Sequence, residues 1–410
     1  MSTRWERLYA QRMQHMSSSI IRELLKLTQR PEVISFAGGL PSPDTFPVEK
    51  FQQAAEKVLR EHSAQALQYG ATEGYLPLRE MIARHTARYG IQVTPDHILI
   101  TNGSQQALDL LGKLFLDPGD HVLVEKPTYL GALQAWNAYQ PRYLSVPLDD
   151  EGMQIPALEQ ALKAKPKFIY ALPNFHNPAG VTLSLERRGQ LVALAEEHGI
   201  PIVEDDPYGQ LRYEGEHLPS LVTLDAGRHA GGQGYAGNVI YLSTFSKTLA
   251  PGLRLGWVVA PVNVIQQLTR AKQGADLHTS TFVQLVAYET ARGGFLDEHV
   301  RQIRQLYKQR RDAMLAALER HFPKGVRWTH PAGGLFLWVT LPEGTDTAEL
   351  LQVAIKEDVA FVPGYAFFAD GSGKNTMRLN FSYSPPQIIE EGIRRLGRAL
   401  DHALAQVAVH

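Results

Sequence analysis

Short apolar runs alternate with longer stretches of helical periodicity through the middle of the chain. The predicted strands are Ile98–Thr101, His121–Glu125, Phe168–Leu172, the run from Ile200 to Asp205, and Val239–Leu242. Strands that are apolar at nearly every position, with helices of ten or more residues between them, indicate a parallel sheet buried on both faces. Polar residues gather after the carboxyl end of each run, at the edge where open α/β sheets bind ligands.

The chain before this region is predicted to be mostly helical. Residues 1 to about 30 carry an apolar stripe with a helical period, and Arg22 lies off that stripe. Glycines and prolines in residues 34–43 predict an irregular path after this first helix. Further helices are expected at 48–62 and 76–89.

The last third of the chain has a different pattern. A long helical stretch runs from Thr281 to about His321, with a break at Gly293-Gly294. Three predicted strands follow, with helices between and after them, at Leu335–Val339, Val359–Val362 and Met377–Phe381. We therefore expect a large α/β domain and a smaller α+β domain, with the boundary inside the long helix.

Composition narrows the function more than the fold. The 410 residues carry a formal net charge of −1 and no cysteine. The charge balance provides no basic stripe for nucleic acid, and the lack of cysteine excludes disulfides, thiolate metal sites and cysteine nucleophiles. The amino terminus lacks the apolar core of a signal peptide, and no apolar run approaches the length of a membrane helix. We expect a cytoplasmic protein that acts on small molecules, without a metal, a nucleic acid or a membrane as partner.

The strongest chemical signal is a lysine just after the strand Val239–Leu242. Lys247 follows the hydroxyls of Thr244 and Ser246, and Arg254 comes seven residues later, after a Pro-Gly turn. An amine that can form a Schiff base, beside hydroxyls and a guanidinium that can bind phosphate, is typical of a site for pyridoxal phosphate. A solvated surface lysine is the alternative, but the apolar residues around Lys247 favour a packed loop and a lysine that loses its charge easily.

Other strand ends supply the remaining groups that pyridoxal phosphate needs. Asp205 can hold a proton on the pyridine nitrogen, which keeps the ring an electron sink. Asn177 and Tyr208 are candidates for the phenolic oxygen, and Tyr129 for stacking on the ring. The phosphate is expected to bind Ser104, Gln105, Thr244, Ser246 and Arg254. The helix expected near Ser104 would present a serine-capped start as an anion site, although Ser104 and Asp205 taken singly could equally be simple caps.

In this combination the chain resembles the fold-type I aminotransferases of class I. The narrower resemblance is to the group with α-aminoadipate and kynurenine aminotransferases and the aminotransferase-like domain of MocR-type regulators. It covers nearly the whole chain and rests on Gly38–Pro41, Tyr69, Thr101–Gln105, Asn177–Gly180, Asp205–Tyr208, Ser243–Lys247, Gly252–Arg254 and Arg378. The chain departs from the family at His176, where glutamine is usual before the Asn-Pro pair, while Asn177 is retained.

The resemblance implies a pyridoxal phosphate-dependent transferase of fold type I that works as a homodimer with two shared sites. Its large cofactor-binding domain would span 46–294, and 1–45 together with 295–410 would form the smaller domain, with the first segment also covering the site. Lys247 would hold the cofactor and move a proton, and Tyr69 would reach the phosphate of the neighbouring subunit. The amino group of an L-amino acid would pass to a 2-oxo acid, which we expect to be 2-oxoglutarate, by a ping-pong mechanism.

Two arginines are candidates for binding the substrate. The alternation in Met377–Phe381 directs Arg378 away from the apolar face of its strand, and the resemblance assigns it the substrate α-carboxylate; a structural salt bridge is the alternative. Arg22 lies in a sequence context in which, in aminoadipate-type members, the arginine binds the distal carboxylate of the substrate. The alternative interpretation, a solvated arginine on a helix surface, is equally compatible with the sequence. The substrate pocket is also expected to include Gly39, Leu40 and Asn177. The expected donors are 2-aminoadipate, glutamate, leucine or aromatic amino acids.

Two other functional classes stay open on the sequence. A MocR-type regulator would use the same domain to sense a ligand, but such proteins carry a winged-helix segment before it, and here the resemblance begins within the first forty residues. A β-lyase or decarboxylase of the same fold is a nearer alternative, because the reaction type depends on which Cα bond stands perpendicular to the cofactor ring.

Overall fold

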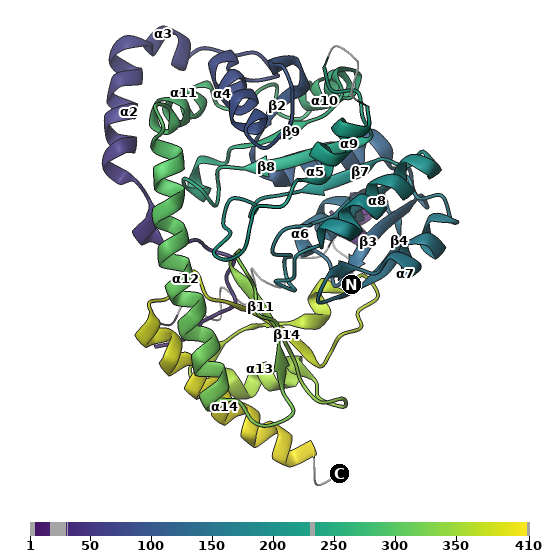
Figure 1. Cartoon of the computed structure of the whole chain (residues 1–410), viewed down its shortest axis with the longest axis vertical. Helices are drawn as coiled ribbons and strands as arrows, with labels where there is room; N and C mark the ends of the chain where they lie inside the picture. Colours follow the sequence, from purple (N-terminus) through teal and green to yellow (C-terminus); the bar gives the residue numbers. More distant parts are fainter. Residues whose placement is uncertain (1–4, 17–29, 31, 230–233, 408–410) are drawn as a thin grey trace.

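Three sheets lie in the described residues, and a long helix connects the parts of the chain that contain the two larger ones (Figure 1). The computed structural model describes residues 5–16, 30, 32–229 and 234–407. Among the helices in these ranges, none is both long and apolar enough to cross a bilayer.

The larger sheet is mostly parallel, as predicted. Its strands are β2 (Ile98–Thr101), β3 (His121–Lys126), β4 (Arg142–Asp149), β5 (Gly152–Met153), β6 (Phe168–Ala171), β7 (Ile202–Asp205), β8 (Val239–Thr244) and β9 (Gly256–Val259), in the order β2-β9-β8-β7-β6-β3-β4-β5. Neighbours from β8 to β4 run parallel, whereas β9 is antiparallel to both of its neighbours and β5 is antiparallel to β4. Strands β2, β6, β7 and β9 are buried at every position, which explains why they lack the alternation of a sheet with one wet face.

Helices cover both faces of this sheet. One face packs against α5 (Gly103–Phe115), α6 (Leu130–Trp136) and α10 (Val262–Gln273), and the other against α7 (Ile155–Leu162), α8 (Leu185–His198) and α9 (Leu221–Arg228). Alternate residues of one strand enter the two cores: Tyr170 packs with the first set and Ile169 with the second. The end of the sheet at β2 and β9 is covered by α4 (Leu76–Ala87) and α11 (Thr281–Ala291), and α11 also contacts α2 (Val48–Glu61) and α3 (Ser63–Ala66).

The smaller sheet lies at the far end of the long helix α12 (Phe295–His321), which runs from the large sheet to the bottom of Figure 1. Its antiparallel strands are β10 (Arg327–Trp328), β11 (Phe336–Thr340), β14 (Thr376–Asn380) and β13 (Val362–Pro363), in that order. The helices α13 (Thr347–Lys356) and α14 (Pro386–Val407) complete the core on this side. The predicted break before α12 is confirmed, because Gly293 and Gly294 adopt positive φ angles of 73° and 84°.

One predicted strand divides between two sheets. The expected strand Val359–Val362 is interrupted at Phe361, which belongs to no strand. Val359 and Ala360 form β12, and Val362 is the first residue of β13. Strand β12 pairs in parallel with β1 (Ile34–Ser35), whereas β13 pairs with β14. The segment near the amino terminus is thereby attached to the carboxyl-terminal part of the chain.

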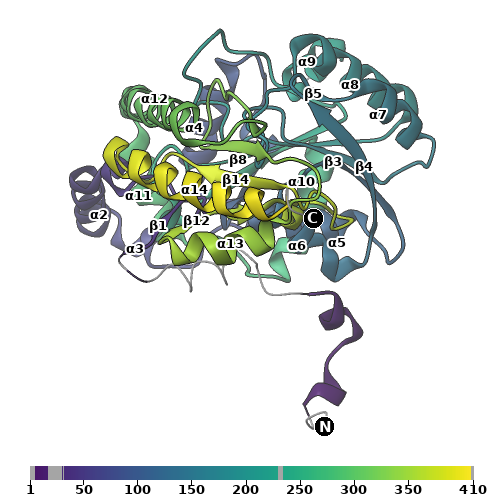
Figure 2. The ribbon, with the colours of Figure 1, turned by 90° about the horizontal axis from the view of Figure 1, so that it is seen from below.

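The amino-terminal helix expectation is wrong where it can be assessed. The described part forms two short 3-10 helices, η1 (Glu6–Leu8) and η2 (Gln11–His15), in a segment that extends away from the rest of the molecule in Figure 2. Neither turn contains a buried residue, so no apolar face stabilises a longer helix there. The apolar stripe from Ile20 to Leu27 lies outside the described residues.

The loops that the structure describes contain five further 3-10 turns. They are η3 (Pro43–Thr45), η4 (Pro95–His97), η5 (Asn137–Tyr139), η6 (Pro251–Leu253) and η7 (Gly364–Phe367). Turn η5 contacts the projecting η2, and η6 immediately precedes Arg254, a residue with a left-handed backbone (φ 51°). The path after Lys247 is thus a tight turn that leads back into β9.

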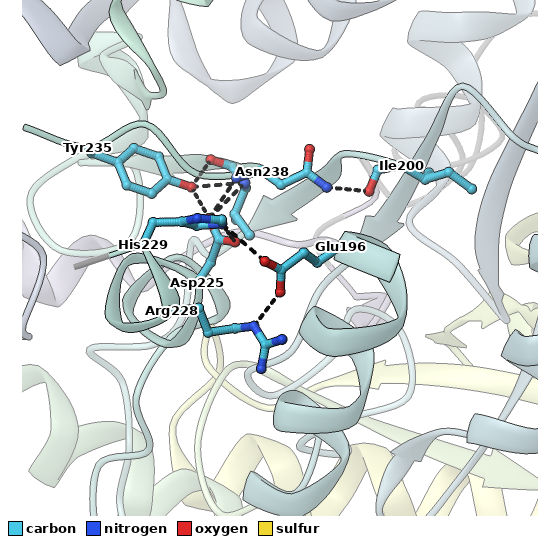
Figure 3. Close-up of polar contacts among 8 residues, drawn as sticks. Glu196, Ile200, Asp225, Arg228, His229, Tyr235 and Asn238 are labelled. Atoms are coloured by element: carbon cyan, nitrogen blue, oxygen red, sulfur yellow. Dashed lines mark hydrogen bonds and ion pairs between the residues drawn. The ribbon is translucent and has the colours of Figure 1, made fainter. Parts of the chain in front are cut away.

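A cluster of polar side chains lies at the amino edge of the large sheet, where β7 and β8 begin (Figure 3). Asp225, in α9, accepts hydrogen bonds from the Tyr235 hydroxyl (2.6 Å) and from the backbone N–H of Asn238 (2.7 Å). Glu196, in α8, forms an ion pair with Arg228. The cluster ties α8 and α9 to the start of β8 at the edge opposite the predicted ligand site.

Candidate active site

Residues from distant parts of the chain line one cavity of about 230 Å³ at the carboxyl ends of β6, β7 and β8. The lining residues are Gly39, Ser104, Gln105, Tyr129, Leu172, Asn177, Asp205, Pro207, Tyr208, Thr244, Ser246, Lys247, Pro251, Arg254, Phe336 and Arg378. Phe336 and Arg378 come from the smaller sheet, so the cavity lies between the two parts of the molecule. Every residue predicted to bind the cofactor is in this lining except Tyr69.

Three predicted residues are not in the lining. Tyr69 is 78% exposed, and its ring contacts His278 at a centroid distance of 5.8 Å. Leu40 follows Gly39 in the chain but is 45% exposed. Arg22 lies outside the residues that the structure describes. Tyr69 therefore makes no contribution to the cavity of its own chain.

One end of the cavity has the features of an anion site. Helix α5 begins at Gly103, which places the N–H groups of its first turn beside Ser104 and Gln105. A Cβ on Gly103 (φ +72°) would come 2.6 Å from Arg254 Nη2, and a Cβ on Gly256 would come 2.8 Å from the Ser104 backbone nitrogen. Only glycine permits both approaches. The Ser104 hydroxyl is buried and has no hydrogen-bond partner among the described residues, which leaves it available to a ligand.

The serine-capped helix start predicted here is wrong in its detail. The N-cap of α5 is Asn102, and its side chain makes no capping hydrogen bond. The Asn102 backbone N–H donates instead to Gln106 Oε1 (2.8 Å). Ser104 is inside the first turn, and its hydroxyl is therefore not used by the helix.

The hydroxyls before the lysine hold their own loop together. Thr244 Oγ1 lies 2.8 Å from the Leu255 carbonyl oxygen and 2.9 Å from Ser246 Oγ. A hydroxyl has one proton, so donation to Leu255 leaves Thr244 as the acceptor from Ser246. The Ser246 backbone N–H also donates to Thr244 Oγ1 (3.0 Å). Thr244 thus fixes the loop that leads to Lys247 as well as lining the cavity.

Lys247 is partly buried in the cavity, and its Nζ donates to the Gly39 carbonyl oxygen (2.9 Å). Burial, and then the positive charges of Arg378 and Arg254, lower the pKa of this lysine to about 8. A pKa near 8 leaves roughly a tenth of the amine uncharged at pH 7, compared with far less for an ordinary lysine. The neutral amine can act as a nucleophile and as a base.

Asp205 ends β7 with a buried carboxyl group. Its Oδ2 accepts a hydrogen bond from the Tyr170 hydroxyl (2.8 Å), while Oδ1 is buried without a partner among the described residues. Burial raises the pKa of Asp205 to about 7; the Tyr170 hydrogen bond opposes this rise and the charge of Asp206 adds to it. An unpaired buried carboxyl oxygen is unfavourable in isolation and suits a ligand that brings a protonated nitrogen.

Tyr129 and Gln105 meet at Gly131. Gln105 Nε2 donates to the Gly131 carbonyl oxygen (2.8 Å), and a Cβ on Gly131 would come 2.5 Å from Tyr129 Cζ. The close approach positions the Tyr129 ring against α6 while it lines the cavity. A flat ring at this place can stack on a planar ligand.

Asn177 joins two sides of the cavity. Its Nδ2 donates to the Tyr208 hydroxyl (3.4 Å), and its Oδ1 accepts from Arg378 Nη1 (2.8 Å). Arg378 Nη2 donates to the Ala37 carbonyl oxygen (2.8 Å), and the guanidinium lies 4.2 Å from the centroid of the Phe336 ring. These contacts hold the asparagine and the arginine side by side.

Arg378 is 1% exposed, and no carboxylate within the described ranges forms an ion pair with it. The salt bridge considered as an alternative is thus absent from this part of the chain. Burial lowers the pKa of Arg378 to about 10. A buried cation without an acidic partner is costly for the folded protein, and an anionic ligand would offset that cost.

Comparison with known proteins identifies the family of this chain. The family model described as aminotransferase class I and II matches residues 31–396. The chain belongs to this family. It is 49% identical to aromatic-amino-acid aminotransferase 1 of Thermococcus litoralis, over 97% of this chain and 94% of the relative. It is 48% identical to the 2-aminoadipate transaminase of Thermus thermophilus, over 98% and 99%.

A solved structure of the same family extends the comparison to the cofactor. The α-aminoadipate aminotransferase LysN of Thermus thermophilus, complexed with N-(5′-phosphopyridoxyl)-L-leucine, matches with a TM-score of 0.91 and 45% identity, over 98% of this chain and 100% of that one. The protein is therefore an aminotransferase of fold type I that uses pyridoxal phosphate and takes an amino acid and a 2-oxo acid as substrates.

The cavity of this aminotransferase fits pyridoxal phosphate on the evidence of its unpaired polar atoms. The free Ser104 hydroxyl and the start of α5 suit the phosphate, and the free Asp205 oxygen suits the pyridine nitrogen. The Lys247 amine, with its lowered pKa, suits the carbonyl carbon.

Sequence reasoning missed two residues of the aminotransferase site. Tyr170 hydrogen-bonds to Asp205, and the available signal was a single tyrosine in the otherwise apolar run Phe168–Leu172. Phe336 lies under Arg378, and nothing in the alternation of its strand distinguishes it from the core residues around it. Both roles depend on which strands become neighbours.

The departure at His176 leaves the site intact. His176 Nε2 lies 3.2 Å from Glu125 Oε2, and its Nδ1 accepts from the Ala179 backbone N–H (3.2 Å). Since Nδ1 is an acceptor, Nε2 carries the ring proton, but this N–H makes no hydrogen bond to a described residue despite the short distance to Glu125. Asn177 keeps its contacts with Tyr208 and Arg378.

Proposed function

We propose that this aminotransferase moves the amino group of acidic, aliphatic and aromatic L-amino acids to 2-oxoglutarate by a ping-pong mechanism. The observation that carries the proposal is the buried Arg378, which has no acidic partner in the described residues and shares one cavity with Lys247. The names of the relatives support the range of donors, since they include aromatic amino acids, 2-aminoadipate and, in a bound form, leucine. A cytoplasmic location is part of the same proposal.

Each polar residue of the cavity takes one task in this reaction. Arg378 binds the substrate α-carboxylate with two donors, and Asn177 holds the guanidinium in position. Lys247 removes the proton from the substrate Cα and later returns a proton, because its lowered pKa keeps a fraction of the amine neutral. Asp205 keeps a proton on the pyridine nitrogen. When bound, pyridoxal phosphate supplies the electron sink for the charge that develops at Cα.

The remaining cofactor contacts follow from the positions around these groups. Ser104, Gln105, Thr244, Ser246 and Arg254 are proposed for the phosphate, Tyr208 and Asn177 for the phenolic oxygen, and Tyr129 for stacking on the ring. Thr244 is expected to contribute mainly through Ser246, because its own hydroxyl is engaged with Leu255.

The substrate side chain is proposed to extend past Gly39 and Leu40. Leu40 is exposed in the single chain and offers apolar contact to leucine and aromatic donors. Arg22 is proposed to bind the distal carboxylate of an acidic substrate, and the support for this role is its sequence context alone.

A homodimer is proposed because parts of the site lie open in the single chain. Tyr69 and Arg254 are exposed, and so are the apolar side chains of Trp5, Leu8 and Tyr9. A second copy would cover this apolar surface and bring its Tyr69 to the phosphate. Inactive Lys247→Ala protein mixed with impaired Tyr69→Phe protein should regain activity through hybrid dimers. No recovery after verified subunit exchange would contradict the shared site.

We also propose that 1–45 and 295–410 act as one unit beside the cofactor-binding part 46–294. The parallel pair of β1 with β12 and their common core with α13 and α14 support this division. The Gly293-Gly294 break marks the proposed boundary.

The cofactor spectrum tests the reaction type directly. Glutamate added to the purified holoenzyme should convert the absorbance to that of pyridoxamine phosphate, with release of one 2-oxoglutarate per site. Release of ammonia or carbon dioxide without this conversion would indicate a β-lyase or a decarboxylase. An unchanged spectrum with every donor class would indicate a ligand sensor.

A further inference from the structure

A second cavity, of about 190 Å³, lies behind the loop that carries Lys247. Helices α4 and α11 and the start of α12 contribute to its walls. Phe245 lines it, while the adjacent Thr244 and Ser246 line the active site, so alternate residues of one segment face the two cavities. The volume is close to the 230 Å³ of the first cavity, which suits a small organic molecule.

The inner part of this second cavity is apolar and contains one unused donor. Ile82, Phe245, Trp257 and Leu296 are buried core residues that line it. Trp257 is 3% exposed, and its indole N–H has no hydrogen-bond partner among the described residues. A buried donor without an acceptor raises the free energy of the folded protein, so an acceptor on a ligand would be stabilising here.

The rim of the second cavity is rich in guanidinium groups. Arg84, Arg88 and Arg292 line it, together with a single carboxylate, Asp297. All three arginines are exposed, and their ion pairs are Arg88 with Asp297 (2.5 Å), Arg292 with Glu289 (2.9 Å) and Arg84 with Glu80 (4.0 Å). Exposed pairs of this kind contribute little free energy, so a ligand carboxylate can exchange for one of them.

The remaining polar lining residues do not supply a competing charge. Gln210 Nε2 lies 2.9 Å from His85 Nε2, which makes that histidine nitrogen an acceptor. Burial lowers the pKa of His85, so the ring is neutral at pH 7. The positive charge of this cavity therefore belongs to the three arginines at its rim.

We propose that this cavity is a second binding site, for a small monocarboxylate with an aromatic or branched apolar body. The apolar body fills the inner part, and the carboxylate contacts the Trp257 indole N–H or the arginine rim. A neutral apolar ligand would leave both polar features unused. The bound molecule would contact Phe245 and the Gly293-Gly294 break at once, and so would connect the lysine loop with the start of α12.

Calorimetry on the holoenzyme with 3-phenylpropionate tests the proposal. Arg378 offers a carboxylate site of its own, so two classes of binding are expected for the wild-type protein. The class at the second cavity should persist in Arg378→Lys and disappear in Ala291→Phe, because Ala291 lines the second cavity and a larger side chain would fill it. Loss of all binding in Arg378→Lys would overturn the proposal, as would the absence of a second class.

Two milder variants keep the test decisive if Ala291→Phe fails to fold. At least one of Trp257→Phe and Arg292→Gln, depending on which of the two residues the carboxylate contacts, should weaken the second class by up to about tenfold, the scale of one hydrogen bond or charged contact. Arg292→Gln should leave binding of the uncharged 3-phenylpropanol unchanged. Arg60→Gln is the matched control, since Arg60 is also exposed and paired but does not line the cavity. Wild-type affinity in both Trp257→Phe and Arg292→Gln would overturn the proposal.

Discussion

Two buried aspartates at opposite edges of the large sheet differ in how their side chains are hydrogen-bonded. Asp225 and Asp205 are both almost fully buried, and each accepts a hydrogen bond from a tyrosine hydroxyl. At the amino edge, the same oxygen of Asp225 also accepts from the Asn238 backbone N–H, and the other oxygen lies 3.5 Å from His229 Nε2 (Figure 3). Neither Asp225 Oδ1 nor Asp205 Oδ1 has a hydrogen-bond partner among the described residues, but at the carboxyl edge Asp205 also has no basic side chain in ion-pair distance within these residues.

The difference separates a structural cluster from a binding site. Paired buried groups stabilise the fold, because each has its hydrogen bonds. Unpaired ones destabilise the empty protein and are retained where a ligand completes them. Ser104 Oγ and Arg378 Nε are buried and unpaired in the same cavity as Asp205 Oδ1. At the amino edge Asp225 Oδ2 accepts from the Tyr235 hydroxyl and from two backbone N–H groups, and the unbonded Asp225 Oδ1 lies beside the His229 imidazole.

The largest effect is expected at Lys247. Lys247→Ala should remove turnover by about 10⁴-fold or more, because nucleophile and proton carrier are one residue. The unfolding midpoint should hardly change, since the amine bonds only to the Gly39 carbonyl oxygen among the described residues. Single-turnover kinetics and thermal unfolding measure the two quantities. Turnover close to that of the wild type would contradict the assignment of Lys247.

Two separate variants, Asp205→Asn and Asp225→Asn, test the contrast between the carboxyl edge and the amino edge of the sheet. Asp205→Asn should lower kcat by about 10²–10⁴-fold, the range for one positioned acid–base group, without any loss of unfolding free energy. Asp225→Asn should keep kcat and lower the unfolding free energy by about 1.5–3 kcal/mol, through weaker hydrogen bonds to a charged group. Equal losses of kcat in both variants would remove the distinction between the two edges.

The stability of the cofactor-free protein should depend on pH through Asp205. Its pKa is raised to about 7 in the folded protein and is about 3.9 in the unfolded chain. Between these values the folded state keeps a proton that the unfolded state has released, so the free energy of unfolding falls as pH rises from 4 to 7. The full effect is up to about 4 kcal/mol and is complete above pH 7.

Denaturant unfolding of the cofactor-free protein at a series of pH values measures this effect. Asp205→Asn cannot ionise, so its advantage over the wild type should grow from pH 4 to pH 8. Parallel pH profiles of the two proteins would mean that burial does not raise the pKa of Asp205.

The smallest effect is expected from the substitution of a buried arginine, Arg378, with a second buried arginine, Arg310, as its control. Arg378→Lys should raise KM for every amino acid alike by roughly 10- to 150-fold, which corresponds to about 1.5–3 kcal/mol, because lysine cannot bind a carboxylate with two donors. Arg310 is the matched control: it is buried too, but it pairs with Asp44 (2.8 Å) and donates to the Ser382 carbonyl oxygen. Arg310→Lys should reduce stability and leave KM unchanged. An unchanged KM in Arg378→Lys would exclude the carboxylate role.

The sequence by itself determined the elements whose cause is local. Apolar runs such as Phe168–Leu172 predict strands because both of their faces are buried, and the structure has β6 there. Residues of the cavity could also be found, since Ser104, Asp205 and Lys247 each lie at or just after a strand end, and all three line the cavity. The bounds of α2, α4, α11 and α12 agree with the helical periodicity to within a few residues.

Only the tertiary structure decided which groups meet. The pairing of β9 with β2, the division of Val359–Val362 between two sheets and the Tyr170 contact with Asp205 all depend on segments that are far apart in sequence. The same holds for the N-cap at Asn102 and for the Thr244 hydroxyl bound to Leu255. Periodicity reports only whether a residue faces apolar surroundings, whereas the choice between a structural and a ligand-binding role depends on whether a distant segment supplies the missing partner.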